Sequence, residues 1–167
     1  MKRLFVLILA VAATVGLSIG VLAANPQDVQ VNWHTNSWII LYIPSGDRSV
    51  TLGTVDGSQY DPATDTWTPI TDGSNHKAYV ITNNAAGFVL SVSSANATGY
   101  QSADLARFQM SGGELTAWTG NLTDTGILSG TSAGIASATN INYQYVPSTD
   151  DAPGDYQVIV TYTATAQ

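Results

Sequence analysis

Apolar and polar residues alternate with a period of two along most of the chain after residue 25, and helical spacing is almost nowhere sustained. In such a pattern, successive side chains point to opposite faces of a β-strand. Ile141, Tyr143 and Tyr145, for example, are separated by single polar residues. Turn-forming segments recur about every 8–12 residues, which is typical of a sandwich or small barrel with roughly eight to ten strands. We therefore predict an all-β, antiparallel β-sandwich of jelly-roll-like or immunoglobulin-like kind.

The same pattern predicts individual strands. Residues 29–34 alternate as a half-buried strand, with Val29, Val31 and Trp33 on one face. Four further stretches have strand-like composition: 38–43, 48–55, 76–84 and 87–95. The first of these is apolar on both faces, which is typical of a central strand or of one covered by a partner. The last two are separated by an Asn- and Gly-containing segment, which predicts a β-hairpin.

The final stretch, 156–167, reads as one long alternating strand. At about 3.3 Å per residue it would span roughly 40 Å, well beyond a common strand. Such length predicts a central strand with neighbours on both sides. Ile159 is the one apolar residue on its polar face. We therefore expect Ile159 to contact something outside the domain.

The N-terminus has the layout of a secretory signal peptide, with Lys2 and Arg3 before an apolar run and with small residues at Ala23 and Ala24. We expect a signal helix at 1–24, one domain at 25–167, and a secreted or cell-surface location. The alternative is a retained anchor, because the run approaches the length of about 20 residues that spans a bilayer. Cleavage would leave no other contact with a membrane.

Composition narrows the classes of partner and chemistry. Only 10% of the residues are charged and the net charge is −7, so the basic surface that nucleic acids require is missing. The chain has no cysteine, which excludes disulfides and thiol chemistry. His34 and His76 lie near no nucleophile motif or metal-ligand spacing, and we interpret both as solvent-facing or cross-strand residues. We expect no enzyme, although a small hydrolase with an aspartate pair remains a third alternative.

Three aspartates in a turn-rich segment, Asp56, Asp61 and Asp65, are the best metal-ligand candidates, because carboxylate oxygens suit Ca²⁺. Their spacing does not match an EF-hand loop, and aspartate in such segments usually bonds its own backbone. We favour turn chemistry over a calcium site, and we expect no other cofactor.

The tryptophans and two asparagines are the remaining candidate sites. Trp67 and Trp118 could stack on sugar rings, whereas Trp33 and Trp38 are interpreted as core residues, since large aromatics usually bury their area. Asn96 and Asn121 each begin an Asn-x-Thr triplet, the acceptor pattern for glycosylation.

Two stretches, "KAYVITNNAAGFVLSVSSA" at 77–95 and "APGDYQVIVTYTATAQ" at 152–167, resemble known surface proteins. They are similar to WxL-type surface domains of Gram-positive bacteria and, more loosely, to TasA-like matrix-fibre and archaeal bundling-pilus subunits. Phe88 stands where the WxL family has tryptophan. The resemblance implies a jelly-roll-like sandwich displayed outside the cell. In some such proteins the N-terminal strand of one subunit completes the sheet of the next.

We therefore predict an extracellular structural protein, a subunit of a surface fibre, pilus or biofilm matrix. Its partners would be copies of itself, joined by β-strand donation in which an extended segment adds to an open sheet edge. Val29, Val31 and Trp33 would be the anchors of the donated strand. The alternative is a monomeric cell-surface module that binds wall or matrix polysaccharide.

Overall fold

The computed structural model describes residues 30, 32 and 34–167. The expected signal segment at 1–24 and the expected anchors Val29, Val31 and Trp33 lie outside these residues. Asn36–Gln167 forms one compact unit, and the following account concerns that unit. None of the described helices is long and apolar enough to cross a membrane.

The described fold is all-β and its named strands pair antiparallel, as the alternation predicts. The strands are β1 (Ile39–Tyr42), β2 (Tyr60–Asp61), β3 (Thr66–Trp67), β4 (Ile70–Thr71), β5 (His76–Thr82), β6 (Phe88–Asn96), β7 (Phe108–Gly112), β8 (Leu115–Gly120), β9 (Thr125–Gly130), β10 (Gly134–Tyr145) and β11 (Val158–Ala166). One short 3₁₀ turn, η1 (Ser45–Asp47), follows β1.

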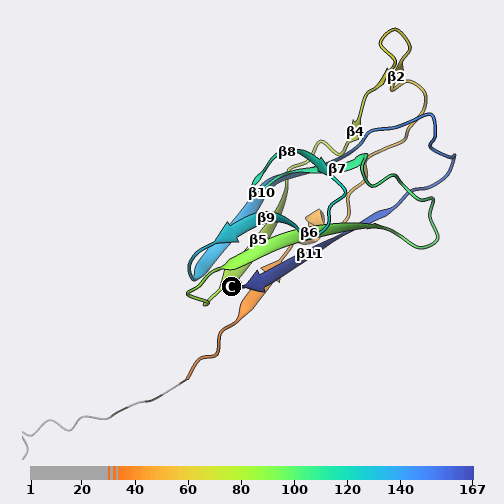
Figure 1. Ribbon diagram of the computed structural model, residues 1–167. Helices are drawn as coiled ribbons and strands as arrows, with labels where there is room; N and C mark the ends of the chain where they lie inside the picture. The colour runs from red at the N-terminus through yellow and green to blue at the C-terminus, as the bar shows by residue number, and fades with distance from the viewer. Residues whose placement is uncertain (1–29, 31, 33) are drawn as a thin grey trace, which may run out of the picture. The chain divides into compact units, whose positions relative to one another are not determined.

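Two larger sheets contain most of the strands (Figure 1). A six-stranded sheet has the order β1-β5-β10-β7-β8, with β4 also pairing with β10, and a three-stranded sheet has the order β11-β6-β9. β2 and β3 form a separate hairpin beyond them. The arrangement is consistent with a β-sandwich.

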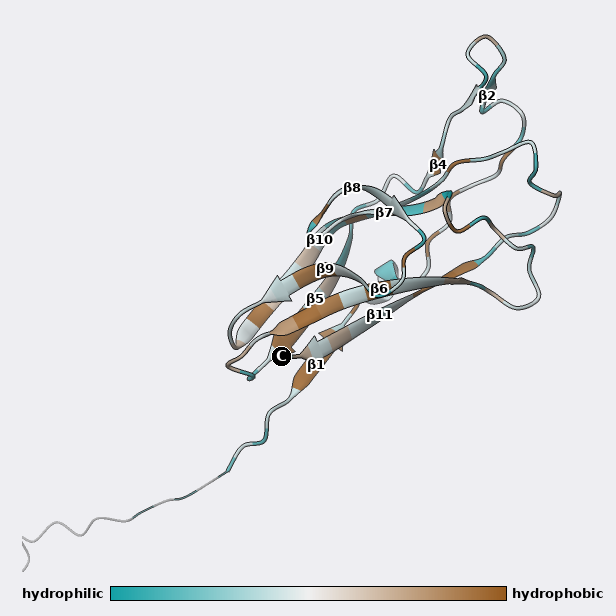
Figure 2. Ribbon diagram, viewed as in Figure 1, coloured by the Kyte–Doolittle hydropathy of each residue, from teal (hydrophilic) through white to brown (hydrophobic). Residues whose placement is uncertain are grey.

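The core comes from the inward positions of both larger sheets. Its largest fully buried side chains include Val80 of β5, Leu90 of β6, Met110 of β7 and Ile141 of β10. Figure 2 shows the hydrophobic segments of β6 and β9 in brown. Period-two alternation gives each strand one apolar face, and packing the two apolar faces together removes both from water.

The predicted hairpin of residues 76–95 is wrong, because β5 and β6 belong to different sheets. The connection crosses from one sheet to the other, and Gly87 takes a positive φ of 95° there. Asn84 holds this crossing, since its side-chain amide donates to the carbonyls of Gly87 at 2.9 Å and Gln167 at 2.7 Å. Both strands can then face the shared core, which a flat hairpin in one sheet would prevent.

The final strand is also placed differently from the prediction. Among the described strands, β11 pairs only with β6 and is an edge strand, not a central one. The length of this strand had suggested that a second neighbouring strand would bury it. Its inward residues instead pack against the core that both sheets share. Ile159 does face outward, with 51% of its surface exposed.

Candidate functional site

A groove of about 1290 Å³ opens between the two larger sheets on the side of β11. One wall carries Val158, Val160 and Tyr162 of β11, and the floor includes Phe108 and Tyr143. Residues 48–55 lie along the same groove. The groove is therefore bordered by a strand edge, which is the geometry that an extended peptide requires.

The backbone of β11 presents an open edge beside this groove. The carbonyl of Gln157 accepts from the amide of Ala97 at 2.9 Å, and the amide of Gln167 donates to Gly87 at 3.1 Å, both on the β6 side. Backbone groups of successive residues point to opposite edges of a strand. The outward-pointing groups belong to the even-numbered residues: Val158, Val160, Tyr162, Ala164 and Ala166. Within the described part of the chain, no strand pairs with this edge.

Residues 48–55 were predicted to be a strand, but the structure describes them as coil. Val50 and Leu52 are half-buried against the core, while Ser49, Thr51 and Gly53 are exposed. Residues 49–55 make no backbone–backbone hydrogen bond to any described residue. Their side chains thus alternate as in a strand, although the backbone lacks a partner.

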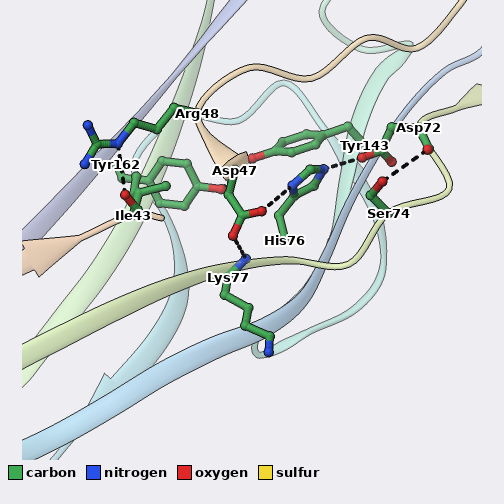
Figure 3. A network of polar contacts seen from close by, with 9 residues as sticks. All are labelled: Ile43, Asp47, Arg48, Asp72, Ser74, His76, Lys77, Tyr143 and Tyr162. Carbon is green, nitrogen blue, oxygen red and sulfur yellow. Dashed lines mark hydrogen bonds and ion pairs between the residues drawn. The ribbon is translucent and has the colours of Figure 1, made fainter. Parts of the chain in front are cut away.

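A buried polar network lies at one end of the groove (Figure 3). His76, the first residue of β5, contacts Asp47 of η1 through Nδ1 at 3.0 Å and Asp72 through Nε2 at very short distance. The amide of Lys77 donates to the second carboxylate oxygen of Asp47 at 3.1 Å. His76 is 7% exposed, so the expectation that it faces solvent is wrong. The alternative, a cross-strand histidine, agrees with its ring contact to Tyr143 of the paired strand β10. Asp47 could not have been identified from sequence, since it lies 29 residues away.

Two carboxylates determine the protonation of His76. Burial lowers the pKa of His76, but the hydrogen bonds to Asp47 and Asp72 and their negative charges together raise it above the ordinary value. An imidazolium donates from both ring nitrogens, which suits two acceptors. Because each nitrogen is held by a carboxylate, neither is available to accept a proton from a substrate. The geometry therefore suits a structural clamp.

Two tyrosines extend the network across the core. The hydroxyls of Tyr143 in β10 and Tyr162 in β11 lie 2.5 Å apart and so connect the two sheets. Burial is the main cause that raises the pKa of both hydroxyls. The ring of His76 packs against that of Tyr143 with centroids 5.7 Å apart. The clamp thus lies next to the bond that joins the sheets beneath the groove.

The three calcium candidates are engaged in local turns. Asp56 accepts from the amide and hydroxyl of Ser58, and Asp61 accepts from Ala63, so hydrogen bonding lowers the pKa of both carboxyls. Asp65 accepts from the hydroxyl of Tyr60 at 2.8 Å. No group of three metal-ligating side chains gathers among the described residues. These contacts match the turn chemistry that the sequence favoured.

The tryptophans are spread over different elements. Trp67 of β3 is half-buried and packs on Tyr60 with ring centroids 5.2 Å apart, while Trp118 of β8 is 40% exposed. Trp38, interpreted as core, is 42% exposed just before β1. That interpretation is wrong because β1 is an edge strand whose outer face no described element covers.

The two glycosylation triplets differ in their surroundings. The side-chain amide of Asn96 donates to the carbonyl of Ala103 at 3.0 Å and its oxygen accepts from the Ala103 amide at 2.9 Å. Asn121 is exposed and takes a positive φ of 50° in a turn. A glycan on Asn96 would be attached at the nitrogen that donates to Ala103, whereas the side chain of Asn121 is exposed.

A scan against models of protein families and a search of curated proteins both find no match to this chain.

Proposed function

We propose that this chain is an extracellular structural protein, a subunit of a surface fibre, pilus or biofilm matrix that assembles by β-strand donation. In this proposal a signal helix directs export, and the domain is a jelly-roll-like or immunoglobulin-like sandwich. The donated strand comes from residues 25–34 of a neighbouring copy, with Val29, Val31 and Trp33 as alternating anchors. The proposal includes no catalytic role.

The observation that carries the proposal is the open edge of β11 beside the groove. Its outward backbone groups can bond an incoming strand, while apolar side chains such as Val158 and Val160 offer contacts to alternate residues of that strand. Natural proteins usually cover or blunt so long an edge, so an uncovered one favours a pairing role.

Residues 48–55 support the same proposal. Val50 and Leu52 fill part of the groove without any backbone pairing in the described structure. A donated strand would add ladder hydrogen bonds that this segment does not make, so replacing it would be favourable.

Replacing Val160 with proline is expected to abolish filaments while leaving the subunit folded. The amide of Val160 points away from β6, so proline removes a donor to the incoming strand without breaking the β11–β6 ladder. Electron microscopy would score filaments and circular dichroism would score folding. Val160→Ala shortens the side chain but keeps the amide, and it should still assemble.

Deleting residues 25–33 removes the donor from the other side of the contact and should also leave monomers. Filaments that persist in folded Val160→Pro protein, or an intact chain that remains monomeric, would overturn the proposal.

The exposure of Trp118 favours one second candidate, a monomeric module that binds wall or matrix polysaccharide. For such a module, Trp118→Ala should weaken binding to insoluble glycans about tenfold, because sugar stacking on an exposed ring would be lost. Trp67→Ala provides the comparison, since Trp67 already packs on Tyr60. Pull-down with equal retention of all three proteins would rule out this candidate.

A further inference from the structure

The outer face of the six-stranded sheet carries an isoleucine row that the proposed fibre contact does not use. Ile40 of β1 pairs with Ile81 of β5, which pairs in turn with Ile135 of β10. The row therefore runs straight across three neighbouring strands. Ile40 is 52% exposed and Ile135 74% exposed, although both could lie in a core. Directly opposed β-branched residues on a sheet face pack closely against one another.

Aromatic residues flank this row. Tyr42 pairs with Tyr79 one row along, and their ring centroids lie 6.0 Å apart. Trp38 lies on the other side of Ile40 along the chain and is also exposed. In Figure 2, β1 is coloured hydrophobic along most of its length. We name Trp38, Ile40, Tyr42, Tyr79, Ile81 and Ile135 the outer apolar patch.

The charge of this face differs from that of the chain. The outward positions on β1, on β5 and on β10 as far as Thr139, together with those next to them, are Trp38, Ile40, Tyr42, Lys77, Tyr79, Ile81, Asn83, Ile135, Ser137 and Thr139. None of these is acidic, whereas the chain carries a net charge of −7. Two copies can therefore meet here with less repulsion than at acidic surfaces.

We propose that the outer apolar patch binds the same patch of a second copy, face to face about a two-fold axis. In such a pair each residue meets its own symmetry-related surface, so one self-complementary patch is sufficient. Burying both patches would remove on the order of 1,000 Å² from water, which lies at the low end of specific interfaces. A polysaccharide fits less well, because the isoleucine row offers no hydrogen bonds to hydroxyl groups.

This contact is independent of strand donation. It uses the outer face of β1, β5 and β10, while the proposed donated strand would pair with the edge of β11, which belongs to the other sheet. Two sets of variants can therefore separate the two contacts. In a chain that forms filaments, the patch would join filaments side by side; in Val160→Pro protein, it would produce dimers.

The test measures self-association of the full chain by sedimentation velocity over a concentration series, in the Val160→Pro background so that filaments do not interfere. Ile135→Asp places a charge in the patch and is expected to weaken the dimer at least tenfold. Ile135 is so exposed that the fold should tolerate the change. Thr139→Asp adds the same charge to an exposed position of the same strand outside the patch, and should change dimerisation less than about twofold.

Ile40→Ser provides a second test that introduces no charge, and it should also weaken the dimer. Equal effects of Ile135→Asp and Thr139→Asp, or a Val160→Pro chain that stays monomeric at every concentration, would overturn the proposal. So would loss of vesicle or polysaccharide binding in Ile135→Asp protein with dimerisation unchanged. Filament loss in Val160→Pro protein is scored separately and decides the strand-donation proposal alone.

Discussion

Replacing His76 with glutamine is expected to destabilise the protein by about 3 kcal/mol at neutral pH, the usual cost of removing one partner from a buried charged cluster. Glutamine retains much of the volume but no charge, which leaves Asp47 and Asp72 close together without a cation. The Asp72 side chain is only 4% exposed, and its Oδ1 already lacks a partner among the described residues. Urea denaturation would give the difference in the free energy of unfolding.

The same network predicts how stability changes with pH. The folded-state pKa of His76 is raised above its ordinary value, so folding favours the protonated ring. The stability that the protonated ring contributes is fully present below the unfolded pKa of about 6.5. It is lost as the pH rises through the higher folded pKa. We expect the free energy of unfolding to fall as the pH rises above about 6.5, and to fall much less in His76→Gln protein. If the free energy of unfolding changed with pH in the same way in both proteins, His76 would not have the stabilising role assigned to it.

Replacing Gly87 with alanine should cost at least about 3 kcal/mol, because two effects combine at the crossing between the sheets. A Cβ at this position would lie 1.8 Å from the carbonyl oxygen of Gly130, so the backbone would have to move. The φ of 95° is also unfavourable for any residue with a side chain. Thermal and urea unfolding would both detect the loss.

Two other glycines are suitable controls for this substitution. Gly126→Ala in β9 meets no atom within 4 Å and has no positive φ, so its stability should change by less than about 1 kcal/mol. Gly53 has a φ of 108° with open space around it, so Gly53→Ala measures backbone strain without a clash. If Gly87→Ala were as stable as Gly126→Ala, the crossing would not be under the constraint described here.

Local patterns determined the secondary structure well because they report the faces of single strands. The alternation of Ile141, Tyr143 and Tyr145 predicted three inward residues, and all three are buried. The outward position of Ile159 was likewise visible from its place in the repeat. The turn bonds of Asp56 and Asp61 are also local, since each involves residues two or three positions away.

Strand partners were decided only by the tertiary structure. Residues 76–95 contain a plausible hairpin, yet β5 joins β1 and β10 while β6 joins β9 and β11. Pairing depends on which apolar faces can be buried together, and this involves residues far apart in the chain. Trp38 became exposed and β11 became an edge strand for the same reason.

The sequence by itself determined an all-β chain of low charge without thiol chemistry, because composition and period-two alternation are local properties. Only the tertiary structure decided where His76 lies, which edge of β11 is open, and that three isoleucines form one row on the outer face of a sheet. Each of these features depends on contacts between elements that are distant in the sequence. Alternation predicts which face of its strand a side chain occupies. It does not predict which strand, carboxylate or surface that side chain will contact.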